Sequence, residues 1–316
     1  MISVIVPVHN AAARLQGCID SLRAQTLEDL QMIFVDDGSS DGSGAMLDAA
    51  AALDGRIVVV HRANGGPAAA RNTALEHVAG EWIMFVDADD RIEPDYAQAL
   101  LDTALSESAQ LVVSDCLIEE EGATRRFGHI VADMAYGSTD EIFQELLAER
   151  LPWSLWGKLY AAGLFADLRF CEDDYIAEDL DANMRIFARK GLRLATDSST
   201  GYLYHVEQGS VDHSFTERHL CQLDVFERLV GLVHHRGIKT QASVEVFYAE
   251  RVLACFGKAI DAGALSAEVR RAFRRAIASH RVELLIGSDA GPKLKLRLIA
   301  ASCGPRLFGA LHRLFG

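Results

Sequence analysis

"EWIMFVDADD", residues 81–90, is an apolar run that ends in a cluster of aspartates. Near-continuous apolar residues are typical of a strand that is buried on both faces of a sheet. Asp87, Asp89 and Asp90 follow this run directly, and carboxylates so close to one another repel. The stretch therefore predicts a buried strand that ends in an acidic turn, together with a positive group that holds the carboxylates in place.

Strand-like and helix-like patterns alternate on both sides of this stretch, up to about residue 116. Further β-branched or apolar runs predict strands at residues 2–8, 31–37, 56–62 and 109–116, with helical spacing between them. This order predicts an α/β fold with a mostly parallel sheet, flanked by helices and joined by right-handed crossovers.

Polar residues follow four of the predicted strands at the ends where ligands bind in such sheets. They are His9–Asn10, Asp36–Asp37, Asn64–Gly66 and Asp87–Asp90. Because the carboxyl ends of parallel strands share one edge of a sheet, we expect these residues to form one site. The pair Asp36–Asp37 either accepts hydrogen bonds from a base or ribose, or forms a turn that caps the next helix.

Asp87 and Asp89, as an Asp-x-Asp pair, are the candidate metal ligands. Carboxylate oxygens suit Mg²⁺ or Mn²⁺, and Mg²⁺ usually takes one or two protein carboxylates together with water and substrate phosphates. Alternate residues of an extended chain also point to the same side. The alternative is a solvated acidic turn in which Asp90 or Asp95 caps a helix.

Two common nucleotide-binding motifs are absent. "PVHNAAARL" follows the first strand in place of G-x-G-x-x-G, which weakens a dinucleotide-binding interpretation. "NGGPAAARN", residues 64–72, lacks the lysine and spacing of a P-loop and resembles a phosphate cradle only loosely. Arg71 in this segment pairs either with a phosphate, with the aspartates or in a surface salt bridge.

The alternation weakens after residue 117, and from about residue 216 the pattern is helical. Residues 137–149 and 177–191 predict helices, residues 154–165 a bend, and residues 192–210 two short strands. We expect an α/β domain over residues 1–215 and a helical C-terminal region over residues 216–316.

The chain of 316 residues carries a formal net charge of −14, which argues against a nucleic-acid partner. Its six cysteines include no C-x-x-C pair, so neither a zinc site nor a disulfide framework is predicted. The N-terminus lacks the features of a signal peptide, and no apolar stretch reaches the ~20 residues of a membrane span. We therefore expect a cytoplasmic protein.

Residues 291–316 reverse the sign of the charge. They hold five Lys or Arg and no Asp or Glu, and leucines are interleaved with the basic residues. A segment of this kind either lies on an anionic membrane or packs as a helical cap on the main domain. The first alternative would make the chain a peripheral membrane protein at the inner face of the cell membrane.

Taken in order, these motifs resemble those of the family 2 glycosyltransferases, whose fold is the Rossmann-like GT-A fold of nucleotide-diphospho-sugar transferases. The matching segments, in about two thirds of the chain, include "VIVPVHN", "VDDGSSDGS", "NGGPAAARN", "FVDADDRIEPD", "WGKLY", "AEDLD" and "YLYHVEQGSV". The resemblance implies a metal-dependent, inverting glycosyltransferase of the hexosyltransferase type. It would move a sugar from a nucleotide-sugar, by default a UDP-sugar, to a hydroxyl of a glycan or glycolipid in surface polysaccharide or glycolipid synthesis.

The resemblance also implies roles for single residues. Asp179 matches the family's general base, which takes the acceptor proton from the face opposite the diphosphate; its plainer role is a negative charge at a helix N-terminus. Asp89, with Asp87, would hold the Mg²⁺ or Mn²⁺ ion that binds the diphosphate. The implied donor-binding residues are Pro7, His9, Asp36, Asp37, Asn64, Arg71 and Asp87, and those on the acceptor side are Trp156, Lys158, Glu178 and His205.

Two of these positions depart from the family's pattern. The family more often has Tyr or Phe where this chain has His9, and Tyr or Arg where it has His205. Base stacking by His9 and the role of His205 therefore stay open.

Two other functions stay open at this stage. A nucleotidyltransferase that makes nucleotide-sugars would be expected to have a glycine-rich, basic loop after the first strand, and this loop is absent. A non-catalytic nucleotide-sugar-binding scaffold has no need of Asp37, Asp89 and Asp179 together, and all three are present.

Overall fold

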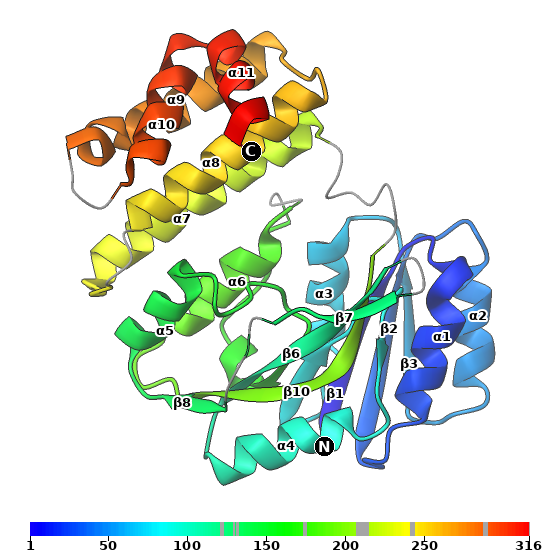
Figure 1. The fold of residues 1–316 in the computed structure, drawn as a ribbon. Helices are drawn as coiled ribbons and strands as arrows, with labels where there is room; N and C mark the ends of the chain where they lie inside the picture. The colour runs from blue at the N-terminus through cyan, green and yellow to red at the C-terminus, as the bar shows by residue number, and fades with distance from the viewer. Residues whose placement is uncertain are drawn as a thin grey trace. The chain divides into compact units, whose positions relative to one another are not determined.

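The computed structural model describes residues 1–120, 123–128, 130, 133–172, 176–206, 215–240, 244–286 and 290–315. The chain divides into two compact units, both drawn in Figure 1. Unit 1 comprises Met1–Asp173 and Glu178–Glu207, and unit 2 comprises Asp174–Ala177 and Gln208–Gly316. Unit 1 contains the sheet, whereas the described part of unit 2 is built from helices.

The stretch "EWIMFVDADD" forms the fourth strand and the loop after it. The strands β1 (Ile2–Val8), β2 (Leu30–Asp37), β3 (Ile57–Arg62) and β4 (Trp82–Phe85) are parallel and lie in the order β3-β2-β1-β4. The last three residues of β4 are buried. The four strands predicted from the N-terminal half of unit 1 are therefore confirmed, and so is the burial of the one that precedes the aspartates.

The other half of the sheet differs from the prediction in two places. The predicted bend at residues 154–165 contains β9 (Lys158–Ala161), which pairs antiparallel with both β4 and β6 (Leu111–Glu120). The two predicted short strands are one strand, β10 (Leu194–His205), which runs parallel to β6 with a register shift between Asp197 and Tyr202. The shift interrupts the apolar alternation, which is why the sequence pattern resembles two strands.

Three further short strands complete the sheet, which has 10 strands among the described residues. They are β5 (Arg91–Ile92) and β8 (Met134–Tyr136), both paired antiparallel with β10, and β7 (Ala123–Arg126), paired antiparallel with β6.

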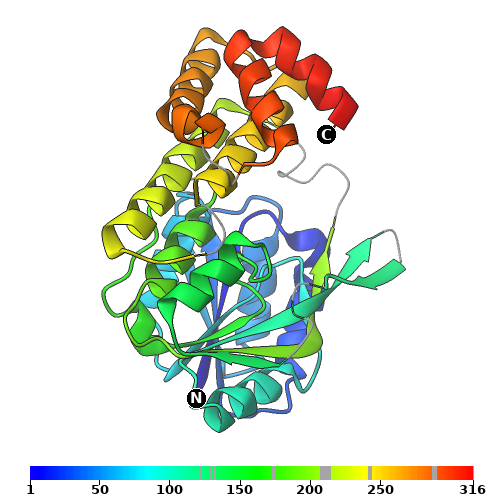
Figure 2. The same ribbon diagram turned by 60° about the vertical axis from the view of Figure 1, so that its left-hand side comes forward.

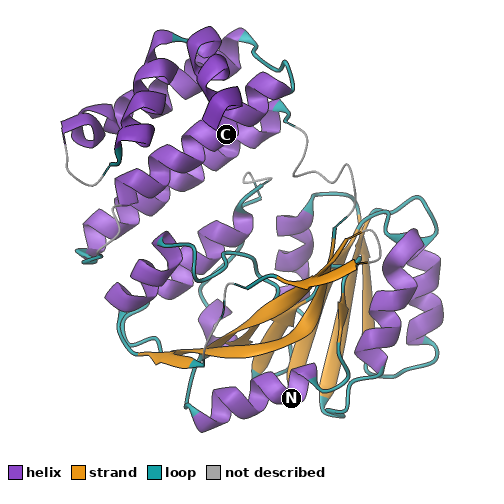
Figure 3. Cartoon of the chain, in the orientation of Figure 1, coloured by secondary structure: helices purple, strands orange, loops and turns teal. Residues whose placement is uncertain are grey.

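Helices cover both faces of the sheet, as Figure 3 shows. Val4 and Val6 of β1 share a buried cluster with Leu15 and Ile19, because alternate side chains of a strand point to the same face. The helices of unit 1 are α1 (Ala12–Arg23), α2 (Ser43–Ala51), α3 (Pro67–Leu75), α4 (Tyr96–Ser106), α5 (Thr139–Leu147) and α6 (Glu178–Phe187).

Unit 2 packs its helices around α8. The helices are α7 (Cys221–Arg236), α8 (Val244–Asp261), α9 (Ala267–Ile286), α10 (Pro292–Cys303) and α11 (Pro305–Phe315), which Figure 2 shows from a second side. Phe256 of α8 stacks on Phe308 of α11 at 5.1 Å and lies 4.7 Å from Phe273 of α9, measured between ring centroids. Among the described helices, none has both the length and the apolar character that crossing a membrane requires.

Candidate active site

Three parallel strands bring the predicted donor-binding residues to one edge of the sheet. β1 pairs with both β2 and β4, with Val8 opposite Asp36 and Ile5 opposite Phe85. The loops after the three strands, which start at His9, Gly38 and Val86, therefore emerge next to one another. This is the edge at which the sequence predicted a ligand site.

Asp37 joins the end of β2 to the glycine turn before α3. Its carboxylate accepts hydrogen bonds from the backbone N–H of Gly65 at 3.0 Å and of Gly66 at 2.7 Å, and from the Arg62 guanidinium at 3.1 Å. The turn at Gly38 and the turn at Asn64 lie so close together that a Cβ added at Gly38 would be 2.8 Å from the Asn64 backbone nitrogen. The buried Asp37 carboxylate thus shapes the turn, in addition to the base contact implied by the resemblance.

Asp36 is held by a histidine that the sequence did not single out. Its carboxylate accepts from the Ser39 backbone N–H at 3.0 Å and pairs with His61 Nδ1 at 2.9 Å, while His61 Nε2 lies 3.0 Å from Asp48. Burial alone would raise the pKa of Asp36, but the bonds from Ser39 and His61 outweigh burial and lower it. The bonds to Asp36 and then to Asp48 raise the pKa of His61.

His9 lies over the ends of β1 and β2 with its ring held from two sides. Its Nδ1 lies 2.9 Å from the Asp37 carbonyl, which accepts only if Nδ1 carries the proton. Its Nε2 can then accept from the side-chain amides of Asn10 at 3.1 Å and Asn64 at 3.2 Å. The ring is exposed and Pro7 is half-buried, so both can contact a ligand at this edge.

The aspartates after β4 have different environments. Asp89 is exposed and the Asp87 side chain is 33% exposed, whereas Asp90 is buried. The Asp90 carboxylate accepts from the Tyr202 hydroxyl at 2.6 Å and from the His205 backbone N–H at 2.8 Å. Burial, and next the charges of Asp87 and Asp89, raise the pKa of Asp90 well above its ordinary value.

Arg71 places a positive charge beside one of the aspartates after β4, Asp87. Its guanidinium donates to Glu178 Oε1 at 2.5 Å and to Asp87 Oδ1 at 3.4 Å, and it lies 5.9 Å from the centre of the Phe170 ring. The side chain is 9% exposed. Arg71 thus links the loop after β4 to the first turn of α6, where Asp179 lies.

Asp179 combines a half-buried position with a raised pKa. Burial, and next the charge of Glu178, raise the pKa to about 7, although the Leu180 N–H bond, Arg71 and Lys158 oppose the increase. The carboxylate accepts from the Leu180 N–H at 2.7 Å. A carboxyl group with a pKa near 7 can take up a proton at neutral pH, which a general base requires.

The residues of "WGKLY" lie between α6 and β10: the charge of Asp179 in α6 acts on Lys158, and Trp156 packs on β10. Lys158 is fully buried and donates to the Ser154 carbonyl at 2.5 Å, and burial lowers its pKa to about 7. Trp156 is half-buried and stacks on Tyr202 and Tyr204 with ring centroids 5.1 and 5.0 Å apart. Lys158 can therefore act on an acceptor only through its neighbours, whereas Trp156 has exposed surface.

Asp87 and Asp89 fit a divalent cation in their chemistry. They offer carboxylate oxygens with exposed surface at one strand end, and hard cations prefer such ligands. Within the described ranges, no group of three or more His, Cys, Asp or Glu side chains is arranged to hold a metal. Two carboxylates suit Mg²⁺ or Mn²⁺ if phosphate oxygens and water supply the other ligands.

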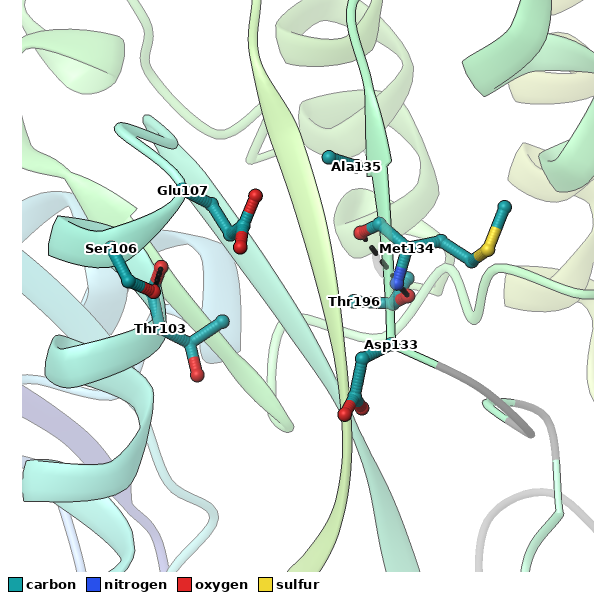
Figure 4. Close-up of a pocket in the computed structure, with 7 residues that line it drawn as sticks. All are labelled: Thr103, Ser106, Glu107, Asp133, Met134, Ala135 and Thr196. Atoms are coloured by element: carbon teal, nitrogen blue, oxygen red, sulfur yellow. Dashed lines mark hydrogen bonds between the residues drawn. The ribbon is translucent and has the colours of Figure 1, made fainter.

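A cavity of about 260 Å³ lies elsewhere, between the C-terminal end of α4, β8 and the first part of β10 (Figure 4). The Met134 backbone N–H donates to Thr196 Oγ1 at 2.9 Å on its wall. The lining residues are Thr103, Ser106, Glu107, Asp133, Met134, Ala135 and Thr196. None of the predicted site residues is among them.

Solved structures of other proteins have a similar fold. Residues 1–349 of S. aureus TarS, solved with UDP-GlcNAc, superpose with a TM-score of 0.77 and 19% identity over 99% of this chain and 91% of that one. The mannosyltransferase PcManGT of Pyrobaculum calidifontis, solved with GDP-Man and Mn²⁺, gives a TM-score of 0.51 and 18% identity over 99% of this chain and 84% of that one. The predicted α/β fold of the GT-A type is thereby confirmed.

The sequence comparisons agree with the fold. The chain is 31% identical over 255 residues to the glycosyltransferase GlyA of Streptococcus pneumoniae. The aligned region covers 78% of this chain and 36% of GlyA. The chain spans between about a third and two thirds of the length of the first curated relatives it matches. Residues 3–176 match the model of glycosyl transferase family 2. The chain belongs to glycosyl transferase family 2.

Proposed function

We propose that this chain transfers a sugar from a nucleotide-diphosphate sugar to a hydroxyl of a glycan or glycolipid acceptor. The observation that carries the proposal is the position of Arg71, which contacts Asp87 after β4 and Glu178 next to Asp179. The side that would hold the donor and the side that would hold the base are joined by this one side chain. The bound UDP-GlcNAc of TarS supports a UDP-sugar as the donor.

The donor side supplies binding and charge. His9 and Asn64, which are exposed beyond the ends of β1 and β3, would contact the nucleoside together with the largely buried Asp36–Asp37 pair at the end of β2. Asp89, with Asp87, would hold a divalent cation, which when bound neutralises the negative charge that grows on the leaving diphosphate. The Mn²⁺ in PcManGT supports this assignment, as do the exposed position of Asp89 and the 33% exposed side chain of Asp87.

The acceptor side supplies the base. A sugar hydroxyl is a poor nucleophile until its proton is taken, and the carboxylate of Asp179 would take it as the new bond forms. Attack from the face opposite the leaving diphosphate inverts the anomeric carbon, as in inverting glycoside hydrolysis. The pKa of about 7 supports this role, since part of the Asp179 population is ionised at neutral pH. Trp156 would border the acceptor.

The biological setting is part of the proposal. The family resemblance supports surface polysaccharide or glycolipid synthesis, and a lipid-linked acceptor would place the enzyme at the inner face of the cell membrane.

Product release from the donor tests the proposal against its two rivals. The protein is incubated with a panel of nucleotide-sugars, with and without Mn²⁺, and release of nucleoside diphosphate is measured. We expect slow, Mn²⁺-dependent release that an acceptor accelerates. Release of pyrophosphate from a nucleoside triphosphate and a sugar phosphate would instead support a nucleotidyltransferase. Binding of a nucleotide-sugar without turnover would support a scaffold.

The aspartates are tested by substitution in the same assay. Asp179→Asn should lower transfer by about 10²- to 10⁴-fold and leave donor affinity nearly unchanged. Asp89→Ala should remove most of the Mn²⁺-dependent gain in donor affinity, whereas Asp95→Ala, an exposed aspartate in the same loop region, serves as the control. An unchanged Mn²⁺ response of Asp89→Ala would place the metal site elsewhere.

A further inference from the structure

The two ends of the chain differ in charge. Residues 208–316 contain 16 Lys or Arg and 10 Asp or Glu, a formal net charge of +6, although the whole chain has a net charge of −14. Four exposed arginines of α9, at positions 270, 271, 274 and 275, lie within one side of that helix, because their spacing repeats about every turn. The C-terminal helical region therefore has a positive net charge, although the net charge of the whole chain is negative.

The two last helices carry exposed apolar stripes. Leu296 and Ile299 of α10 are 47% and 48% exposed, and Leu307 and Leu314 of α11 are 49% and 76% exposed. The spacings of three and seven residues put each pair on one side of its helix. The core of unit 2 is filled from another side of these helices, where Leu298 and Phe308 are buried.

Basic side chains border the stripe of α11. Arg306 and Arg313 are exposed and lie next to Leu307 and Leu314 along the helix, seven residues apart. Residues 291–316 contain no Asp or Glu to neutralise them. We call these residues of α11, Arg306, Leu307, Arg313 and Leu314, the terminal surface; Leu296 and Ile299 add exposed apolar side chains on the neighbouring helix α10.

The combination of exposed arginines and exposed apolar side chains distinguishes a dissolved polyanion from an anionic membrane as the partner. A dissolved polyanion is attracted by the arginines but gains nothing from exposed leucines and isoleucine. An anionic membrane takes both, because apolar side chains insert at the headgroup boundary while Lys and Arg pair with the lipid headgroups. We propose that the terminal surface docks on an anionic lipid membrane.

Vesicle flotation of the full chain tests the docking. The probes are phosphatidylcholine vesicles with and without phosphatidylglycerol, in the absence of donor and acceptor. We expect the chain to float with the anionic vesicles and to remain behind with the neutral ones. Leu307→Ser/Leu314→Ser should weaken the partition by at least about tenfold, because two leucines lose their insertion.

Two more variants complete the test. Arg306→Gln/Arg313→Gln should weaken binding to anionic vesicles by about tenfold or more, from roughly 1 kcal/mol per basic residue near the surface. The matched control is Leu53→Ser/Leu105→Ser, which removes leucines 75% and 62% exposed in unit 1 and should leave binding unchanged.

Other outcomes overturn the proposal. Equal binding to neutral and anionic vesicles, or undiminished binding by the leucine variant, would exclude the terminal surface as the docking site. A wild-type dimer in light scattering that the leucine variant separates would make the surface a contact between two copies of the chain. Because no sugar transfer is measured, the result is independent of the proposed function.

Discussion

At the scale of single residues, two ionisable groups of opposite sign have pKa values brought close to 7. Burial raises the pKa of Asp179 to about 7 and lowers that of Lys158 to about 7. The charge of each of these two side chains acts on the pKa of the other. Lys158 Nζ donates to the Ser154 carbonyl, and so does Nδ2 of Asn183, which lies one turn after Asp179 in α6. If Asp179 is the base, as we propose, Lys158 would act on it through its charge.

Lys158→Met should move the acidic limb of the pH profile of transfer to higher pH. The ammonium group favours the ionised form of Asp179, so its removal should raise the pKa of Asp179 and, with Asp179 as the proposed base, lower kcat/KM several-fold near pH 6. The other groups that act on this pair, Glu178, Arg71 and Cys116, stay in place. Tyr160→Phe, which loses the hydroxyl bond to Asn183, is the control for a purely structural effect.

If both variants lose activity and the acidic limb of the pH profile stays at the same pH in both, Lys158 has only a structural role. A limb that moves in Lys158→Met alone would support the electrostatic role.

Asp179 also makes the stability of the protein depend on pH. Its folded pKa of about 7 lies above the unfolded value of about 3.9, so the folded chain holds more protons between these values and stability falls as pH rises through that window. Asp179→Asn removes this loss. Its Tm should match that of the wild type near pH 4 and exceed it by several degrees at pH 8, measured by differential scanning calorimetry. A Tm difference that does not change with pH would contradict the raised pKa.

At the scale of elements, the loop after β4 is tied to β10. Asp90 accepts from the Tyr202 hydroxyl and the His205 backbone, and the Asp87 backbone N–H donates to the same hydroxyl at 3.2 Å. Tyr202 in turn stacks on Trp156, which precedes β9. The aspartates that would bind the donor thus depend on a strand that comes more than a hundred residues later in the chain.

Tyr202→Phe should show this dependence. It leaves the buried Asp90 carboxyl with one partner fewer, which should cost about 1–3 kcal/mol of stability and weaken Mn²⁺-dependent donor affinity more than kcat. Tyr248→Phe in α8, which loses a bond to the Ala276 carbonyl, is the matched control. In urea unfolding, we expect the two variants to lose comparable stability. In donor titration, we expect only Tyr202→Phe to lose donor affinity. A loss of donor affinity in both variants would contradict a specific link between β10 and the loop after β4.

The same elements explain how much could be predicted from sequence. The strands up to β4 are confirmed because each is a short apolar run bounded by turn residues. β9 could not be predicted, since its four residues are too few to show a period and its place between β4 and β6 is set by tertiary pairing. His61 and Tyr202 were missed for a related reason: their partners Asp36 and Asp90 are distant in sequence, and no local pattern marks them.

At the scale of the whole molecule, the acidic, sheet-containing unit and the basic, helical unit would have separate tasks. Residues 1–207 contain the predicted donor, metal and base residues, whereas the positive net charge belongs to residues 208–316. If the helical unit docks on a membrane, it raises the local concentration of enzyme near a lipid-linked acceptor without changing the chemistry at Asp179.

The separation predicts a split between two activities of one variant. Arg306→Gln/Arg313→Gln should hydrolyse the donor at the wild-type rate, because neither arginine is among the residues that contact Asp87 or Glu178. With a lipid-linked acceptor in anionic vesicles, the same variant should lose kcat/KM by about tenfold, in line with its weaker membrane binding. Added salt should reduce the wild-type rate towards that of the variant, since it screens the attraction between arginines and headgroups. Donor hydrolysis and vesicle-acceptor transfer that fall together would instead mean that the two arginines support the fold.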